Sequence, residues 1–148
     1  MRNFPTIDIN HFLNEQSVGK EGFLFSELYG PQRIEKPHQH FFFLLVLFEK
    51  GKGEHIIDFN TYKITDHQIH ILFPNQVHSW DLKSSSIAYQ LMVDKAHFEK
   101  NSTHFRYPFA YYQQNPVISL SSKIFTNLLY EFKAIREELA DDKALQPL

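Results

Sequence analysis

The chain has 148 residues, 15 Lys and Arg against 17 Asp and Glu, a formal net charge of −2 and no cysteine. This size fits one domain with a substantial core, while the scattered basic residues exclude a strong nucleic-acid binder acting alone and the lack of cysteine excludes a disulfide scaffold. The longest apolar run, Phe41 to Phe48, is too short to cross a bilayer, and the N-terminus shows no signal-peptide pattern. We therefore expect a cytoplasmic protein.

Residues 1–21 have mixed polarity and predict an N-terminal arm, with a short helix indicated by the spacing of Ile9, Phe12 and Leu13. From residue 22 onwards, short β-branched and aromatic runs alternate with turn residues, as in sandwiches and barrels. Polar breaks of hairpin length, such as Asn60-Thr61 and Asp66-His67, predict antiparallel pairing of consecutive strands. The predicted strands are Phe23–Tyr29, Phe41–Glu49, Glu54–Phe59, Tyr62–Thr65, Gln68–Phe73, Val77–Leu82 and Ile87–Val93.

The C-terminal third predicts one long amphipathic helix, capped by Ser121 or Ser122. The aromatic stretch before it, residues 95–114, is expected to pack on the outside of the barrel. The apolar stripe of the helix either packs on the barrel or forms a dimer interface. The predicted interface residues are Leu128, Leu129, Phe132 and Ile135, and the expected division of the chain is arm 1–21, barrel 22–118 and dimerisation helix 119–148.

Two histidines, His38 and His40, lie immediately before the apolar run 41–48, and a third, His78, follows the turn residue Pro74. If His38 to Phe48 is one strand, alternation places His38, His40, Phe42, Leu44 and Val46 on one face. It places Phe41, Phe43, Leu45, Leu47 and Phe48 largely on the other. Since both faces are apolar, we expect both to be buried. The remaining histidines are expected at surface or half-buried positions: His11, His55, His67, His70, His97 and His104.

These motifs resemble the cupin barrel, and more closely the N-terminal ligand-sensing domain of AraC-type bacterial transcription regulators. The resemblance is carried by residues 37–40, the turn Gly51-Lys52-Gly53, the stretch 53–59, and residues 73–80. It implies a mainly β fold, a cupin-like antiparallel β-barrel (double-stranded β-helix) followed by a C-terminal amphipathic helix.

Metal-binding cupins supply two His and a Glu from the first motif and a third His from the second. The matching positions here are His38, His40, Leu44 and His78. Leu44 has no lone pair, which weakens the case for an enzyme.

Three roles stay open for the histidines: hydrogen-bonded rings at the barrel mouth, contacts to a small ligand, or a metal site made by His38, His40 and His78. Trp80 lies one alternation beyond His78 and is expected to form a wall of the pocket. No catalytic residue and no cofactor is predicted. The predicted ligand-binding residues are His38, His40, Phe42, Leu44, His78 and Trp80.

We expect a sensor domain and not an enzyme. A small-molecule effector binds in the barrel, the arm Met1–Pro5 covers or leaves the pocket, and the helix mediates homodimer formation. The resemblance implies contact with DNA only through a C-terminal helix-turn-helix domain missing from this chain, which would then be a fragment.

The alternative is a stand-alone metal-dependent cupin enzyme, a dioxygenase or isomerase. A third hypothesis is a sugar-binding barrel that uses Trp80, Tyr89, Tyr111 and Tyr112.

Overall fold

The computed structural model describes residues 4–7, 17–20, 22–100 and 111–141. The helices are α1 (Lys95–Lys100) and α3 (Ser122–Asp141), and residues 111–114 are also helical. The strands are β1 (Thr6–Ile7), β2 (Ser17–Lys20), β3 (Phe23–Tyr29), β4 (Gln32–His40), β5 (Phe42–Lys50), β6 (Gly53–Ile57), β7 (Asn60–Ile64), β8 (Gln68–Leu72), β9 (Val77–Leu82), β10 (Ile87–Asp94) and β11 (Val117–Ser119).

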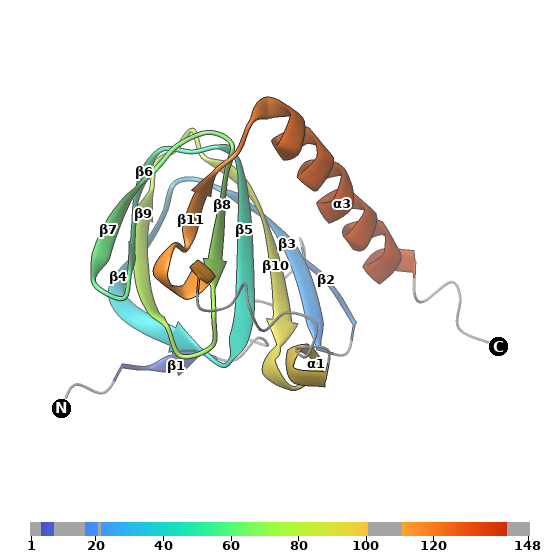
Figure 1. Cartoon of the computed structure of the whole chain (residues 1–148), viewed down its shortest axis with the longest axis horizontal. Coiled ribbons are helices and arrows are strands. Elements are labelled where there is room, and N and C mark those ends of the chain that lie inside the picture. Colours follow the sequence, from blue (N-terminus) through green and yellow to red (C-terminus); the bar gives the residue numbers. More distant parts are fainter. Residues whose placement is uncertain (1–3, 8–16, 21, 101–110, 142–148) are drawn as a thin grey trace.

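Two sheets face each other, and α3 lies on the outside of the larger one (Figure 1). The smaller sheet has the order β1-β4-β9-β6-β7, and the larger has the order β11-β8-β5-β10-β3-β2. All neighbours are antiparallel except β1 and β4. The predicted fold class, mainly β and cupin-like with a C-terminal helix, is confirmed. Within the described residues, no strand pairing joins the two sheets into a closed barrel.

The predicted strands are present, and each predicted end lies within two residues of the observed one. Their predicted antiparallel pairing in chain order is confirmed for β6 with β7 and wrong for the other predicted strands. Among the described strands, only β2 with β3 and β6 with β7 pair with their sequence neighbour. From β3 to β10 nearly every connection crosses from one sheet to the other, so a short polar break here marks a crossing more often than a hairpin.

No predicted strand corresponds to β4, because the predicted alternation of faces treats residues 38–48 as one continuous strand. The chain instead changes sheets at Phe41, which is 57% exposed: His38 and His40 end β4 in the smaller sheet, and Phe42 begins β5 in the larger one. Pro37 falls where the register between β4 and β9 shifts, between Ile34 and His38. A proline has no N–H to donate, and an irregularity in the ladder accommodates it.

The turn between β6 and β7 is formed by Asp58 and Phe59, and not by Asn60-Thr61 as predicted. Both turn residues have positive φ, 47° and 70°. Tertiary bonds hold this turn, because the Asp58 carboxylate accepts hydrogen bonds from the Val77 N–H (3.0 Å) and from Gln76 Nε2 (2.8 Å). The turn at Pro74 and Asn75 matches the prediction, and Asn75 has the left-handed φ of 73° that asparagine tolerates.

The described parts of the predicted arm, residues 4–7 and 17–20, are not a free arm, because they include strands of the two sheets. Strand β1 pairs in parallel with the end of β4, opposite Gln39 and His40. The backbone N–H of Gln39 donates to the carbonyl of Pro5 (3.0 Å). Strand β2 forms the edge of the larger sheet. The short helix predicted around Ile9, Phe12 and Leu13 lies outside the described residues.

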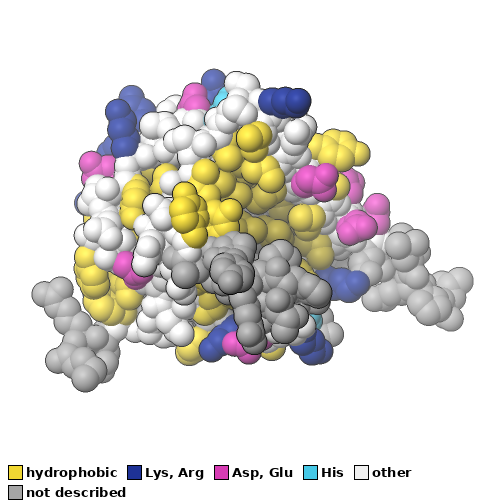
Figure 2. Space-filling model, in the orientation of Figure 1, with side chains coloured by type: hydrophobic (Ala, Val, Ile, Leu, Met, Phe, Trp, Pro, Cys, Tyr) yellow, Lys and Arg dark blue, Asp and Glu magenta, His cyan; other side chains and the backbone are white. Residues whose placement is uncertain are grey.

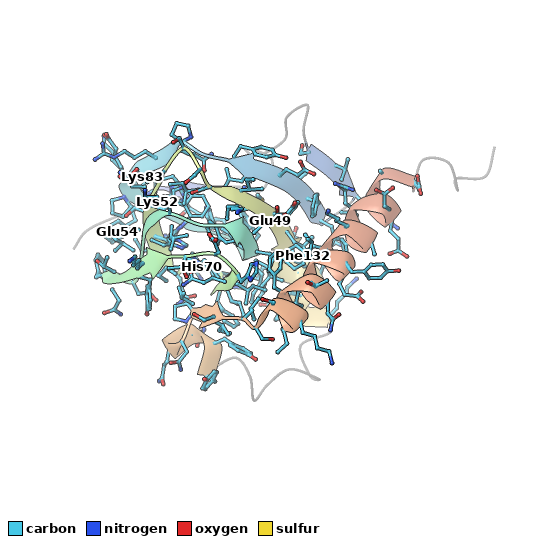
Figure 3. The ribbon with its side chains drawn as sticks, turned by 90° about the horizontal axis from the view of Figure 1, so that it is seen from above. Glu49, Lys52, Glu54, His70, Lys83 and Phe132 are labelled. Atoms are coloured by element: carbon cyan, nitrogen blue, oxygen red, sulfur yellow. The ribbon has the colours of Figure 1, made fainter. Side chains whose placement is uncertain are left out.

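The two faces of β5 are both buried, as predicted. Phe42, Leu44 and Val46 point between the sheets, together with Phe48, which the prediction had placed on the opposite face. The other face of the larger sheet packs under α3, where the apolar side chains form a second cluster. Figure 2 shows hydrophobic side chains gathered in the middle of the face that Figure 1 views. From above, His70 lies between the sheets and Phe132 lies beneath α3 (Figure 3).

The helix α3 begins as predicted, because the Ser121 hydroxyl accepts a hydrogen bond from the Ile124 N–H (3.2 Å). Phe125 and Phe132 are buried in the outer cluster, with Leu128, Leu129 and Ile135 half-buried beside them. Phe132 is thus a core residue of this chain. Packing on the sheet covers its ring, and its predicted role as a dimer contact stays a prediction. The dimer role of the three half-buried residues stays a prediction.

No described helix is both long enough and apolar enough to span a membrane.

Replacing Gly53 with Ala is expected to destabilise the protein by about 2 kcal/mol or more. Gly53 has a φ of +125°, and a Cβ there would overlap the carbonyl oxygen of Asp81 on the neighbouring strand. Replacing the adjacent, exposed Lys52 with Ala is the matched control and should change stability by less than about 0.5 kcal/mol. Urea unfolding measures both. Equal midpoints for the two variants would contradict the conformational argument.

Candidate functional site

Three histidines meet between the sheets. His38 on β4 lies directly opposite His78 on β9 in the strand register, and His40 is the next residue of β4 with the same orientation. All three rings are buried, with ring centroids 4.7 to 4.8 Å apart. One nitrogen of each ring lies within 4.8 Å of the others. The structure therefore brings together the three imidazoles that were predicted as possible metal ligands.

The other predicted pocket residues surround these rings. Phe42 stacks on His40, with centroids 4.4 Å apart and 15° between the rings. Trp80 lies edge-on to His78 at 5.5 Å, on the same side of β9, as predicted. Leu44 is buried in the apolar cluster between the sheets. The six predicted residues thus line one interior region, whereas their contacts with a ligand stay a prediction.

Two further histidines belong to the cluster, and their predicted surface or half-buried positions were wrong. His55 on β6 and His70 on β8 are both 0% exposed. A usable indication was present in the sequence: His55 alternates with Ile57, and His70 with Leu72, so each histidine shares the face of a core residue. His67 and His97 are half-buried, as expected, and His11 and His104 lie outside the described residues.

Hydrogen bonds link these rings in series. His55 Nε2 lies 2.8 Å from His78 Nδ1, and His55 Nδ1 lies 2.8 Å from His70 Nδ1. His70 Nε2 lies 2.9 Å from Gln68 Oε1. Because β6 and β8 belong to different sheets, the contact between His55 and His70 crosses the interior. The chain of bonds ends at His78, in the group of three rings.

Burial lowers the pKa of every ring in this cluster, because water is excluded from around the charged form. The pKa of His40 falls to about 3, through burial and then the neighbouring His38. The pKa of His70 also falls to about 3, through burial. For His55 and His78, burial and then the adjacent imidazoles hold the pKa well below its ordinary value. The rings are therefore neutral near pH 7, and each keeps one nitrogen lone pair.

The geometry fits a metal or a ligand that is a hydrogen-bond donor. Within the described part of the chain, Nε2 of His38 and Nε2 of His78 are buried without a hydrogen-bond partner. Buried polar atoms in proteins are nearly always paired, so an occupant of this region would satisfy them. Three imidazole nitrogens suit Zn²⁺ and similar ions. A tetrahedral zinc site holds such nitrogens about 3.3 Å apart, so small ring movements from the present spacing would close it.

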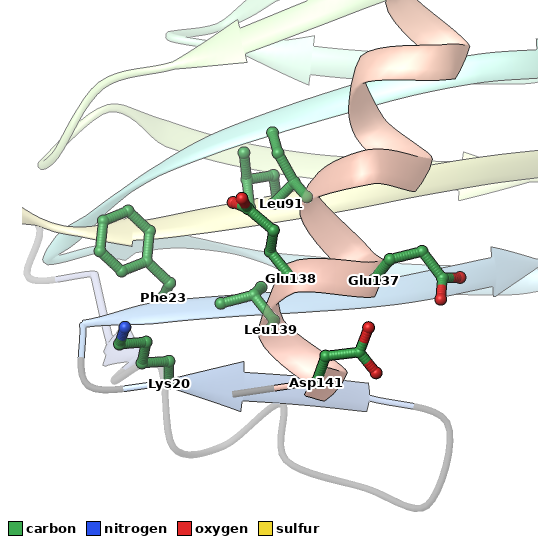
Figure 4. Close-up of a pocket in the computed structure, with 8 residues that line it drawn as sticks. Lys20, Phe23, Leu91, Glu137, Glu138, Leu139 and Asp141 are labelled. Atoms are coloured by element: carbon green, nitrogen blue, oxygen red, sulfur yellow. The ribbon is translucent and has the colours of Figure 1, made fainter. Parts of the chain in front are cut away.

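A separate groove lies outside the barrel, at the C-terminal end of α3 (Figure 4). Its volume is about 610 Å³, and its lining is Lys20, Phe23, Leu91, Ile135, Glu137, Glu138, Leu139 and Asp141. None of these residues belongs to the histidine cluster. The groove therefore differs from the pocket that the sequence predicted between the sheets.

The fold and the site together define a cupin-like β domain with imidazoles gathered in its interior. Residues 22–93 match the model of the family described as the AraC-like ligand binding domain. This part of the chain is therefore similar to that family, in agreement with the resemblance that the sequence motifs indicated.

No curated protein matches this chain in sequence. Among solved structures, protein NMB1881 from Neisseria meningitidis is 13% identical, with a TM-score of 0.43 over 57% of this chain and 91% of that one. An oxalate decarboxylase variant from Bacillus subtilis is 17% identical, with a TM-score of 0.40 over 55% of this chain and 22% of that one. The plu4264 protein from Photorhabdus luminescens is 14% identical, with a TM-score of 0.41 over 64% and 77%.

Proposed function

We propose that this chain is the ligand-sensing domain of an AraC-type transcription regulator, and that its effector is a small molecule bound between the two sheets. The match of residues 22–93 to the AraC-like ligand binding domain is the observation that carries the proposal. The cluster of His38, His40 and His78 supports an interior location, because it offers buried, neutral hydrogen-bond acceptors among apolar walls. Ligand pockets typically combine a few polar groups with such a lining.

The remaining parts of the proposal concern partners. A second copy of the chain is expected to bind through the half-buried residues Leu128, Leu129 and Ile135 of α3, and a helix-turn-helix domain outside this chain is expected to contact DNA. The protein acts in the cytoplasm, and it binds its effector without catalysis. The pairing of β1 with β4 beside Gln39 and His40 supports a coupling between the N-terminal segment and the site.

A second candidate function is metal binding by His38, His40 and His78, in a sensor or in a cupin enzyme. The unpartnered Nε2 atoms of His38 and His78 favour it, together with the close approach of the three rings. A bound metal would supply a Lewis acid with at least one open position. The buried Leu44 argues against the complete cupin ligand set, so we favour binding over catalysis.

Zinc is expected to stabilise the wild-type protein, by about 2.7 kcal/mol when its concentration is 100 times its Kd, and to give no such stabilisation to His78→Ala. The reason is that only the folded chain assembles the three rings. Thermal unfolding with ZnCl₂ after EDTA treatment measures the effect. The control is His67→Asn, which removes a histidine outside the cluster at a φ of 61° that asparagine tolerates.

A metabolite screen in the same assay separates the candidates. Stabilisation by a small molecule without metal supports the sensor alone, and stabilisation by zinc that His78→Ala abolishes supports the metal site. Zinc stabilisation that survives in His78→Ala would contradict that site. If neither metals nor metabolites raise the melting temperature, the proposed interior ligand site is wrong.

A further inference from the structure

The hydrogen-bonded chain that ends at His78 begins at a side chain whose orientation is fixed by the backbone. The Thr65 N–H donates to Gln68 Oε1 (3.0 Å), and Gln68 Nε2 donates to the carbonyl of Lys63 (3.2 Å). A backbone N–H can only donate and a backbone carbonyl can only accept. Rotating the Gln68 amide by 180° would set donor against donor and acceptor against acceptor. The oxygen of this amide therefore faces His70.

This orientation determines where the proton lies on each following ring. Gln68 Oε1 can only accept, so His70 Nε2 carries a proton and His70 Nδ1, in the neutral ring, carries a lone pair. His55 Nδ1 must then donate to His70 Nδ1, which leaves a lone pair on His55 Nε2. By the same rule, His78 Nδ1 donates to His55 Nε2. The lone pair of His78 is consequently on Nε2, the atom without a hydrogen-bond partner.

We propose that Gln68, His70 and His55 are positioning residues, which hold His78 in the Nδ1–H tautomer so that its Nε2 lone pair is available to a divalent metal ion bound with His38 and His40. The proposal rests on the metal-binding candidate stated above. Histidine ligands of metals generally donate their second ring N–H to another group, and this fixes both the tautomer and the ring plane. Here the acceptor of that N–H is a neutral imidazole, itself oriented through a second imidazole and an amide.

The groups that orient His78 differ in two ways from the single carboxylate or carbonyl that often accepts the second N–H of a metal-binding histidine: they form a chain of three side chains, and all three are neutral. A carboxylate acceptor would add negative charge to the site, whereas the His55, His70 and Gln68 chain adds none. All three side chains are buried, at 0%, 0% and 5% exposure, so water does not compete for these bonds. Because the three imidazoles and the side chains behind them are neutral, they would not compensate the charge of a bound Zn²⁺. An anionic fourth ligand would therefore be favoured.

Nitrogen-15 NMR of metal-free protein at pH 7.5 tests the tautomers directly, because protonated and unprotonated ring nitrogens resonate in separate regions. We expect the proton on Nδ1 of His78 and His55, and on Nε2 of His70. A proton on Nε2 of His78 would overturn the proposal. This test does not require any metal to bind, so it remains decisive even if the metal-binding candidate fails.

Zinc affinity of two variants tests the positioning role. Gln68→Met keeps the length of the side chain and removes the acceptor, and we expect it to bind Zn²⁺ 10- to 100-fold more weakly than wild type. Gln68→Glu, in its protonated form, can still accept from His70 and donate to Lys63, and we expect it to stay within about threefold of wild type. Equal zinc affinity for wild type and Gln68→Met, by competition with a chelator, would overturn the proposal.

Discussion

Metal-free protein is expected to lose its stability steeply between pH 6.5 and pH 5. Four buried rings, His40, His55, His70 and His78, have a folded-state pKa far below 6.5, with burial as the first cause. Below pH 6.5 these histidines bind protons in the unfolded chain but stay neutral in the folded chain, so the free energy of unfolding falls as the pH falls. The contribution of these neutral histidines to stability is fully present above pH 6.5. It continues to decrease towards about pH 3, the folded-state pKa of His40 and His70.

The free energy of unfolding is expected to fall with a slope that approaches about 1.4 kcal/mol per pH unit for each histidine. For all four histidines the slope near pH 5 is about 5 kcal/mol per pH unit. Since domains of this kind are stable by roughly 5–15 kcal/mol, the loss of about 8 kcal/mol expected between pH 7 and pH 5 removes a large part of the stability. Urea unfolding with EDTA at several pH values measures the slope. Replacing His70 with Phe should reduce that slope by about one proton, whatever it does to absolute stability. A midpoint that stays constant from pH 7 to pH 5 would contradict the assignment of neutral buried rings.

Replacing Phe132 with Ala is expected to lower the free energy of unfolding by about 3–5 kcal/mol, because its ring is 4% exposed and fills the space between α3 and the larger sheet. Tyr130 is the control: it lies on the same helix, is 73% exposed, and its replacement with Ala should cost less than about 0.5 kcal/mol. Urea unfolding at two protein concentrations separates core packing from self-association.

A destabilisation that does not change with protein concentration supports the intramolecular role of Phe132. If Phe132→Ala instead leaves the unfolding midpoint of the monomer unchanged and dissociates a dimer, the assignment to the core is wrong. The ion pair between Arg136 and Glu27 (2.8 Å) also joins α3 to β3, but partial exposure of both side chains limits its contribution to about 1 kcal/mol or less.

Much of the fold could be predicted from local patterns. The strands β3 and β9 have their predicted bounds, because alternation and flanking turn residues define both ends. The helix α3 begins at its predicted cap and packs on the larger sheet through its apolar stripe. The strand pairing could not be predicted in the same way, since a break such as Asp66-His67 has the composition of a hairpin turn whether the chain returns beside itself or crosses to the other sheet.

The candidate site was predicted in part. His38, His40 and His78 converge because β4 and β9 are neighbours. The family resemblance implied that the three histidines meet, but the strand pairing that brings them together was not predicted. His55 and His70 were missed because each lies in a stretch of alternating polar and apolar residues, where a surface or half-buried histidine is the commoner outcome. Only the tertiary structure shows that the polar side chain of Gln68 faces inward, where Thr65 and Lys63 satisfy its hydrogen bonds.

The contact between His55 and His70 also limits how the two layers can move. The attraction between apolar surfaces has no preferred direction of its own. The hydrogen bond between His55 and His70 is directional. A shift of one sheet relative to the other that broke it would leave two buried ring nitrogens without a partner, at a cost of about 1–3 kcal/mol each. This bond therefore helps to fix the position of one sheet relative to the other, and with it the width of the interior in which a ligand would bind.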